Sequence, residues 1–315
     1  MKHSTLFFYL IIALIIACEQ QKSDSVFSFE KTEQGVELSE NGHPVFFYQK
    51  EPKSLDGEYI CNNYLHPLYN LNGEIITEEF PADHPYHRGV FWAWHQIYVQ
   101  GESIGDGWIM KNIEQNVTEL KTSADRNSAK LKAEVLWKSP NFENGKPFIS
   151  EQTSIIVHPI EDNVRKIDFT IALKALVPNV EVGGSDDEKG YGGLCIRVKL
   201  PADITFTSQN KNITPQNESV NAGPWMDFSG TFIEKSELNG VSILCHPKTP
   251  NYPAPWILRS KTSMQNIVFP GRQRIEVPVN EPLVLHYRLI IHNGGANSIE
   301  LDNFQSEYEN SDIKL

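Results

Sequence analysis

The stretch LVLHYRLIIHNG, residues 283–294, alternates between two kinds of side chain with a period of two. In an extended chain, alternate side chains point to opposite faces. The first set is apolar or aromatic, and the second set carries the cations. The first set is Leu283, Leu285, Tyr287, Leu289 and Ile291, and the second is Val284, His286, Arg288, Ile290 and His292. The stretch therefore predicts a β-strand with one buried face.

The same pattern recurs along the chain between clusters of Gly, Pro, Asn and Asp. It occurs in VFSFEKT (26–32), HPVFFYQK (43–50), KLKAEVLWKS (130–139), TSIIVHPI (153–160), VRKIDFTIALKAL (164–176), LCIRVKL (194–200), TFIEK (231–235) and VSILCHP (241–247). No window of twelve residues carries a helical stripe, and no fixed-period repeat is present. We therefore predict an all-β protein, a large antiparallel β-sandwich formed by a single domain at 26–315. A short helix is expected within 297–315.

Two predicted strands place cations on one face. In LCIRVKL, Arg197 and Lys199 alternate with apolar residues, as Arg288 does in the opening stretch. One interpretation is a solvated outer face. The other is a concave sheet face beneath irregular loops, where Arg197 and Arg288 bind a carboxylate or sulfate, since guanidinium binds such groups bidentately.

The N-terminus predicts export. Residues 1–17 have a basic start at Lys2 and an apolar run too short to span a bilayer, and Cys18 follows Ala17. This resembles a bacterial lipoprotein signal, in which the cysteine becomes the lipidated first residue. We expect a signal peptide at 1–17, lipidation of Cys18, a polar tether at 18–25 and a location in the cell envelope, periplasmic or on the outer-membrane surface, with the membrane contacted through the lipid alone.

Charge and cysteine content narrow the choice of partners. The formal net charge is −12, and removing residues 1–17 removes Lys2 and no acid, which gives −13. An acidic chain is a poor partner for nucleic acid, but a local cluster of cations still allows an anionic small ligand. Cys61, Cys195 and Cys245 have no disulfide or zinc spacing and are expected in the core. A homodimer is compatible with the sequence, which does not fix the oligomeric state.

The stretch DHPYHRGVFWAWHQ, residues 83–96, concentrates chemically versatile side chains. We divide it into a proline-bent loop at 83–88 and a strand at 89–96, and we assign His95 to the strand as a structural residue. Because a free imidazole has a reference pKa near neutrality, we expect one of His84 and His87 to act as base and the other as acid. Lys189 and Tyr191, in the Gly-rich loop SDDEKGYGGLCIR (185–197), are candidates to complete the pair.

Other residues are candidates for holding a substrate. NAGPWMDFSG (221–230) places Trp225 and Asp227 in a turn-rich segment, and LCHPKTPNYPAPWILR (244–259) contains four prolines and aromatic side chains. Aromatic platforms suit sugar rings. The substrate-binding candidates are Tyr86, Arg88, Trp108, Arg197, His246, Trp256 and Arg288.

Two alternatives for the chemistry stay open. His84-x-x-His87, with Asp83, His95 or His246 nearby, could bind a divalent metal, but the pattern is common and no third ligand has a defined spacing, so we expect no metal and no cofactor. A glycoside hydrolase would need two carboxylates across a cleft. Asp83, Asp106, Asp186, Asp187 and Asp227 are available, and the sequence singles out no pair.

The segment YLHPLYNLNGEIITEEFPADHPYHRGVFWAWHQIYVQGESIGDGW, residues 64–108, resembles the bacterial family labelled "methane oxygenase PmoA-like". Further matches follow in order in DDEKGYGGLCIR, GPWMDFSG, CHPKTPNYPAPW and LVLHYRLIIHNG. Tyr86 stands where many members have a histidine, and QGESIGDGW departs from the usual ending. The resemblance covers almost the whole chain after the N-terminal segment.

The resemblance implies a sandwich similar to sugar-mutarotase and lyase domains and a role in polysaccharide degradation. Some relatives are associated with ulvan, a sulfated polymer of rhamnose and uronate. The implied activity is a dehydratase that removes water from the unsaturated uronyl end of ulvan oligosaccharides, an anionic substrate. The alternatives are a glycoside hydrolase on uronate and rhamnose oligosaccharides and a non-catalytic glycan-binding surface lipoprotein.

Overall fold

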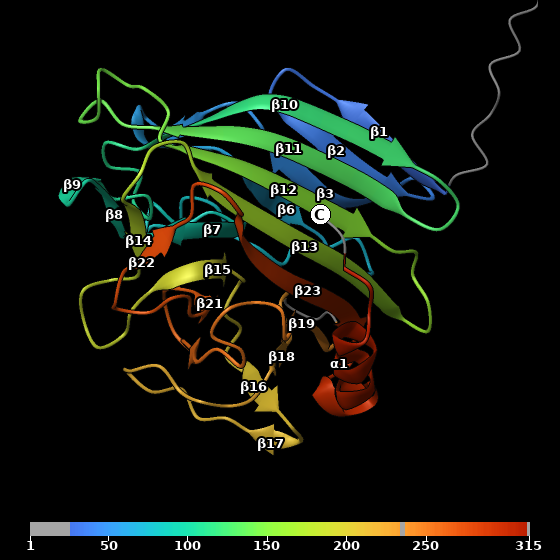
Figure 1. Ribbon diagram of the computed structural model, residues 1–315. Helices are drawn as coiled ribbons and strands as arrows, with labels where there is room; N and C mark the ends of the chain where they lie inside the picture. Colours follow the sequence, from blue (N-terminus) through green and yellow to red (C-terminus); the bar gives the residue numbers. More distant parts are fainter. Residues whose placement is uncertain (1–25, 234–236, 314–315) are drawn as a thin grey trace, which may run out of the picture.

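Two large antiparallel sheets, two smaller sheets and one short α-helix form the described part of the protein, shown as a computed structural model in Figure 1. The structure describes residues 26–233 and 237–313, and the predicted all-β sandwich is confirmed. The predicted signal peptide, Cys18 and the tether lie outside these residues. Among the described residues, no helix is both long and apolar enough to cross a membrane.

The first large sheet has eight strands and contains the N-terminal hairpins. In spatial order they are β1 (Phe27–Lys31), β2 (Gly35–Glu40), β3 (His43–Gln49), β6 (Tyr64–Leu68), β7 (Val90–Trp94), β15 (Gly192–Ile196), β21 (Gln265–Ile267) and β20 (Trp256–Ile257). The strands of this sheet come from distant parts of the chain, so segments far apart in sequence meet on its faces.

The second large sheet has nine strands, and its longest members run side by side in Figure 1. In spatial order they are β10 (Glu114–Ala124), β11 (Ala129–Lys138), β12 (Ile149–Val157), β13 (Val164–Ala175), β23 (Leu283–Asn293), β19 (Asn239–Cys245), β18 (Trp225–Gly230), β16 (Thr205–Ser208) and β17 (Lys211–Asn212). The smaller elements are β22 (Ile275–Val277), β14 (Val180–Gly183), β8 (Gln96–Val99) and β9 (Glu102–Gly105) in one sheet, the hairpin β4 (Lys53–Leu55) and β5 (Glu58–Cys61), the 3-10 turn η1 (Ala296–Ser298) and α1 (Leu301–Glu309).

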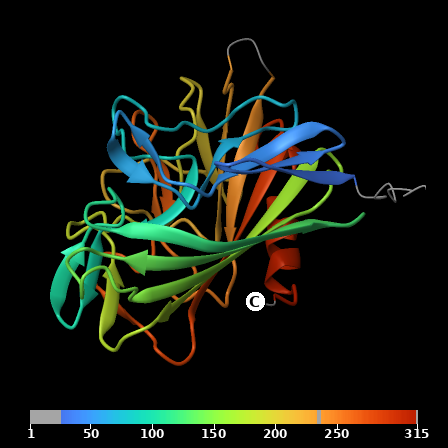
Figure 2. The same ribbon diagram turned by 90° about the horizontal axis from the view of Figure 1, so that it is seen from above.

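The core lies between the two large sheets, which form separate layers in Figure 2. Trp92 of β7 packs against Phe169 of β13 at 6.4 Å between ring centroids, and Trp94 packs against Trp137 at 5.9 Å. Glu151 of β12 is fully buried among them and accepts hydrogen bonds from the indole nitrogens of Trp92 and Trp137 at 2.9 and 2.8 Å. Burial raises the pKa of Glu151. The sheets are thus joined by aromatic packing and by a polar network around one carboxyl group.

The opening stretch forms β23, and its apolar set is directed into the core as predicted. Its other face is not an open concave surface. Ile290 lies in an apolar cluster beneath α1, together with Leu301 and Tyr308 of that helix. Arg288 forms a bidentate ion pair with Asp168 of β13, with its guanidinium carbon 4.5 Å from the Tyr308 ring centroid. The prediction that Arg288 lies on a concave ligand-binding face is therefore wrong, because the C-terminal helix covers this part of the sheet.

Some local expectations are confirmed and others are not. The C-terminal helix is present, and Cys61, Cys195 and Cys245 are buried free thiols. The segment 231–235 is not a strand at 231–233, and its remainder lies outside the described residues. The turn-rich interpretation of 221–230 is wrong for 225–230, which forms β18 with Trp225 and Asp227 buried. The long strand β10 was not expected, since polar residues break its apolar alternation.

Strand β7 separates the core from a second apolar cluster. Val90, Trp92 and Trp94 face the core, as the alternation predicts. Phe91 and Ala93 face the outside of the eight-stranded sheet and pack with other buried residues. That cluster is Cys61, Tyr64, Phe91, Ala93, Trp108, Cys195 and Met264, with Tyr86 and Tyr191 packed against it. It forms a firm apolar base for the polar side chains above it.

Candidate active site

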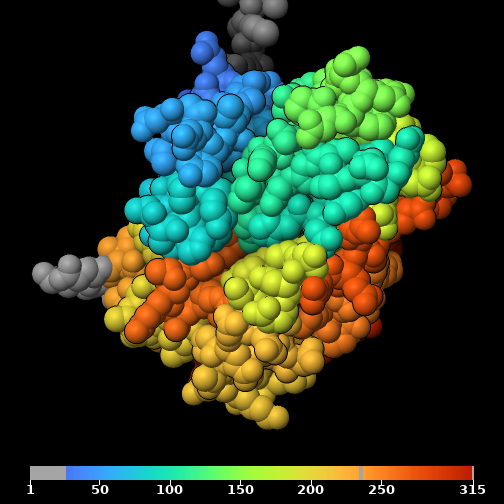
Figure 3. Space-filling model, turned by 90° about the vertical axis from the view of Figure 1, so that its left-hand side faces the viewer, coloured from blue at the N-terminus to red at the C-terminus, as the bar shows by residue number. Residues whose placement is uncertain are grey.

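A cavity of about 320 Å³ opens above this second cluster. Its lining comes from five separate parts of the chain, and it combines imidazole, phenol, indole and cationic groups. The lining residues are His84, Tyr86, His87, His95, Trp108, Lys189, Tyr191, Asn217, Arg259, Thr262 and Ser263. Figure 3 shows the cyan, yellow-green, gold and orange segments that carry most of these residues meeting on one face. We define this cavity as the histidine cavity.

The loop before β7 brings two histidines together. The backbone amide of His87 donates to the His84 carbonyl at 2.9 Å, which closes a tight turn. The two imidazole rings stack with centroids 4.6 Å apart and planes 2° from parallel. Gly89 ends the loop at φ +42°, where an added Cβ would lie 1.9 Å from the Leu65 carbonyl oxygen. Only glycine fits this approach, so the DHPYHRG sequence fixes both histidines relative to the sheet.

Asp83 ties this loop to the opposite side of the cavity. Its carboxylate accepts hydrogen bonds from Nη1 and Nη2 of Arg197 at 3.0 and 2.7 Å and from the Ser263 amide at 2.9 Å. It also lies 2.9 Å from Nδ1 of His84. Although partial burial acts to raise the pKa of Asp83, the bonds from Arg197, Ser263 and His84 hold that pKa below its usual range. Asp83 therefore stays ionised and orients the His84 ring, leaving Nε2 of His84 for other partners.

His87 is a buried, neutral imidazole. His87 is only 2 % exposed, and its Nδ1 lies 3.4 Å from Nη1 of Arg197. Burial, reinforced by the charges of His84 and Arg197, lowers the pKa of His87 to about 2. Because the guanidinium can only donate, Nδ1 of His87 accepts and Nε2 carries the proton. His87 is thus suited to donating a hydrogen bond rather than to the proton transfer expected from the sequence.

His95 is oriented by a carboxylate, although the sequence predicted His84 and His87 as the acid–base pair. Nδ1 of His95 lies 2.9 Å from a carboxylate oxygen of Asp106, whose other oxygen accepts from the Trp108 amide at 2.9 Å. The His95 ring stacks on Trp108 at 4.9 Å and 17°. His95 lies in the bend between β7 and β8, so the prediction that it belongs to a strand at 89–96 is wrong, and it lines the cavity. The alternation still indicates the correct side, because Phe91 and Ala93 of β7 belong to the apolar cluster that lies beneath the cavity.

The remaining wall is cationic and aromatic. Tyr191 lies 5.3 Å from Trp108 between ring centroids, and the Arg259 guanidinium carbon lies 5.6 Å from the Tyr191 centroid. Lys189 forms an ion pair with Asp187 at 3.8 Å. Asp187 also accepts from the Ser185 hydroxyl and from the amides of residues 189 and 190, which orders the Gly-rich loop. Two cations, Lys189 and Arg259, therefore line the cavity. Two of its histidines, His84 and His95, are each oriented by a carboxylate outside the lining.

Six of the predicted site residues meet in the histidine cavity: His84, Tyr86, His87, Trp108, Lys189 and Tyr191. Two more, Arg88 and Arg197, lie behind its wall. Arg88 donates to the carbonyls of Tyr86 and Trp108 at 3.2 and 3.1 Å, and Arg197 binds Asp83 and Glu78. Both guanidinium groups are engaged internally, so they position the lining residues, and the expectation that they bind substrate directly is wrong.

His246, Trp256 and Arg288 are not part of the histidine cavity. His246 is buried, and its ring centroid is 5.1 Å from that of Tyr308 in α1, the helix that also covers Arg288. Trp256 is buried in the core and donates from its indole nitrogen to the Gly223 carbonyl at 2.9 Å. These three predictions are wrong because each side chain is consumed by packing against another element.

Five lining residues were not among the predicted substrate-binding or acid–base residues: His95, Asn217, Arg259, Thr262 and Ser263. Arg259 ends the proline-rich stretch 244–259, whose aromatic residues are its more conspicuous feature. Thr262 and Ser263 adopt the left-handed conformation at φ +46° and +66°, which few residues other than glycine favour. This bend lets the Ser263 backbone contact both Asp83 and Arg197. No local sequence pattern predicts this bend.

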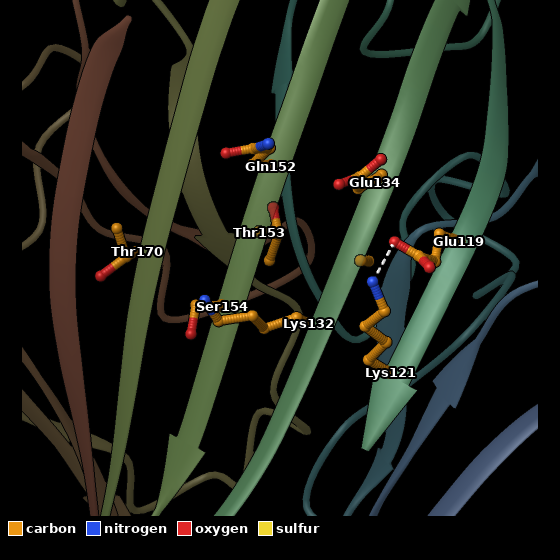
Figure 4. Close-up of a pocket in the computed structure, with 9 residues that line it drawn as sticks. Glu119, Lys121, Lys132, Glu134, Gln152, Thr153, Ser154 and Thr170 are labelled. Atoms are coloured by element: carbon orange, nitrogen blue, oxygen red, sulfur yellow. Dashed lines mark hydrogen bonds and ion pairs between the residues drawn. The ribbon is translucent and has the colours of Figure 1, made fainter. Parts of the chain in front are cut away.

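A second cavity lies on the outer face of the nine-stranded sheet (Figure 4). Its side chains project from neighbouring strands, and Lys121 is bonded to Glu119 at 2.7 Å. The lining residues are Glu119, Lys121, Lys132, Ala133, Glu134, Gln152, Thr153, Ser154 and Thr170. They mix both charges without any aromatic or histidine side chain, which is the ordinary composition of a solvated sheet face. The histidine cavity is the better candidate.

The donor groups of the histidine cavity bear on the metal and hydrolase alternatives. No group of three or more His, Cys, Asp or Glu side chains within 26–233 and 237–313 is placed to hold a metal ion. None of the lining residues is a carboxylate. Asp83 and Asp106 instead hold histidines, Asp186 pairs with Arg272, and Asp227 is buried against His292. A pair of carboxylates across this cavity is absent from the described residues.

Comparison with known proteins gives a family without an assigned activity. The chain belongs to DUF6807, a family of unknown function, which matches residues 35–304. The match includes every residue of the histidine cavity. No curated protein matches the sequence. The family match therefore assigns no activity to the chain, and the evidence for function is the geometry of the site.

Proposed function

We propose that this protein is a carbon–oxygen lyase, a dehydratase that removes water from an anionic sugar in the histidine cavity. The observation that carries the proposal is a pair of histidines, His84 and His95, each held at Nδ1 by a carboxylate, in a cavity with cations and no lining carboxylate. An imidazole fixed in this way presents Nε2 for proton transfer. Two such groups supply the acid and the base that an elimination needs.

The chemistry assigns a role to each group. One histidine takes a proton from carbon, the bond from the neighbouring carbon to its hydroxyl oxygen breaks, and the other histidine protonates the departing oxygen to give water. Neutral His87 donates a hydrogen bond from Nε2 to the oxygen on which charge develops. The phenols of Tyr86 and Tyr191 hydrogen-bond to sugar hydroxyls, and burial raises the pKa of Tyr86, which keeps it protonated. Trp108 lies beneath the ring.

An oligosaccharide fits the shape of the region better than a single sugar. A shallow cavity of about 250 Å³ adjoins the histidine cavity and shares Asn217 and Arg259 with it. It adds Lys261 to the cations of the site. A chain with one sugar in the histidine cavity and the next in the adjoining one would keep contact with positive charge. The resemblance to polysaccharide-degrading proteins suggests the unsaturated uronyl end of ulvan-type oligosaccharides as the substrate.

The alternatives make different use of the same cavity. A glycoside hydrolase is disfavoured, because its two carboxylates are lacking among the lining residues. A non-catalytic glycan-binding protein would need the aromatic and cationic groups but not the carboxylates behind His84 and His95. We propose an envelope location through a lipid on Cys18 as well, as the N-terminal sequence predicts.

The test is a mass measurement on unsaturated ulvan oligosaccharides incubated with the protein. Dehydration predicts a product lighter by one water, about 18 mass units, with no shortening of the chain. Variants His84→Asn and His95→Asn should each reduce the rate about a hundredfold or more while remaining folded. A heavier, shortened product would indicate hydrolysis, and binding without a mass change would contradict both enzymatic functions.

A further inference from the structure

Arg259 is the arginine among the lining residues of the histidine cavity. Arg88 also donates only to carbonyls, but it is 1 % exposed and lies behind the wall. Arg197 is paired with Asp83 and Glu78. Arg259 has only carbonyl partners in the part of the chain that the structure describes: Nη1 donates to residues 216 and 258 at 2.6 and 2.8 Å, and Nη2 donates to residue 217 at 2.8 Å. Carbonyl dipoles fix the position of a guanidinium without neutralising its charge.

The donors that remain on Arg259 form a fork. A guanidinium has five N–H groups, and the three bonds to carbonyls leave Nε and one hydrogen of Nη2. The same edge, Nε with Nη2, binds both oxygens of Asp168 in Arg288, at 2.5 and 2.9 Å. Arg259 therefore retains the edge that this protein uses elsewhere to bind a carboxylate.

The position of Arg259 places its guanidinium group at the substrate region. Arg259 lines both the histidine cavity and the adjoining shallow cavity, and its guanidinium lies over the ring of Tyr191. Lys189, which precedes Tyr191 in the Gly-rich loop, lines the same cavity and forms an ion pair with Asp187 at 3.8 Å. A planar anion held by the Arg259 fork would thus lie within the site and next to a second cation.

We propose that Arg259 is the specificity-determining residue of the site and binds the carboxylate of a uronate sugar, with Lys189 as a supporting cation. This inference rests on the proposed function in taking the histidine cavity as the substrate site. It replaces the arginines that the sequence favoured, which are all engaged internally. Arg259 would therefore give a sugar acid a higher affinity than the corresponding neutral sugar.

The test compares two ligands on matched variants. The ligands are the unsaturated uronyl disaccharide and the same disaccharide with its carboxyl group reduced to an alcohol, and affinity is measured by titration calorimetry. All proteins carry His84→Asn, which slows the reaction so that little substrate is consumed during the titration. Arg259→Gln should weaken binding of the acid about 10- to 100-fold and leave the neutral form within about twofold. Arg259→Lys should fall between Arg259→Gln and the parent, because it keeps the charge without the fork.

A control arginine makes the comparison specific. Arg274 also lies over a tyrosine ring, 3.8 Å from the Tyr98 centroid, but it pairs with Glu181 and is outside the histidine cavity. Arg274→Gln should bind both ligands as the parent does. Equal losses for both ligands in Arg259→Gln, or no loss for the acid, would overturn the inference. Selective binding of the acid without any mass change in the wild-type reaction would support Arg259 and refute the dehydratase.

Discussion

The neutral state of His87 leads to a measurable dependence of stability on pH. Its folded pKa is about 2, well below the ordinary value of about 6.5, because the ring is buried beside His84 and Arg197. The unfolded chain therefore binds a proton that the folded chain excludes, and stability falls as pH falls from about 6.5. At pH 4.5, two units below the ordinary pKa, this one residue lowers the free energy of unfolding by about 2.7 kcal/mol.

The assay is urea unfolding followed by tryptophan fluorescence at pH 7.0 and pH 4.5. Other groups also titrate, including His66 and His286, whose burial lowers their pKa values to about 4. Comparison with His87→Gln isolates the single site, since the variant should lose about 2.7 kcal/mol less than wild type over this interval. The same substitution at exposed His43 is the control and should leave the wild-type difference in place. If wild type and His87→Gln lost equal amounts of unfolding free energy between pH 7.0 and pH 4.5, His87 would not be the neutral imidazole that the structure indicates.

Three further variants test other parts of the account. Asp106→Asn removes the carboxylate that orients His95 and should lower kcat about a hundredfold with an unchanged urea midpoint, whereas an unchanged kcat would remove His95 from the mechanism. Arg288→Gln breaks the pair with Asp168 beneath α1 and should cost about 3 kcal/mol of stability without altering the affinity for the uronyl disaccharide; weaker binding in the folded protein would return Arg288 to the site. Glu151→Ala leaves buried donors of both sheets without an acceptor and should cost more than about 3 kcal/mol in urea unfolding, a result that an unchanged midpoint would contradict.

The sheet architecture could be predicted because alternation is a local signal. The pattern in 283–294 and in β7 correctly gives the face directed into the core. It does not give what covers the other face. The cation-bearing face of β23 is covered by α1, whose docking depends on contacts such as Ile290 with Leu301. Alternation therefore predicts sheets well and predicts poorly which polar face stays open.

The candidate site was predicted in its composition but not in its assembly. Residues 84–87, 108 and 189–191 meet because loops from distant strands converge over the eight-stranded sheet. Residue type alone could not separate Arg197, which is consumed by Asp83, from Arg259, which keeps a free edge. That distinction depends on bonds between residues distant in sequence, 114 positions apart for Arg197 with Asp83 and 42 for Arg259 with the carbonyl of residue 217. Long-range pairing of this kind leaves no mark in a single sequence.

The position of the substrate tests the central claim most directly. A crystal structure of the His84→Asn variant with an unsaturated uronyl disaccharide should show the sugar over Trp108, with its carboxylate on Arg259 and a carbon-bound hydrogen facing His95 or residue 84. The competing position is the polar face of β10 to β13 shown in Figure 4. Sugar density in the histidine cavity would support the account, and density only on that sheet face would contradict it.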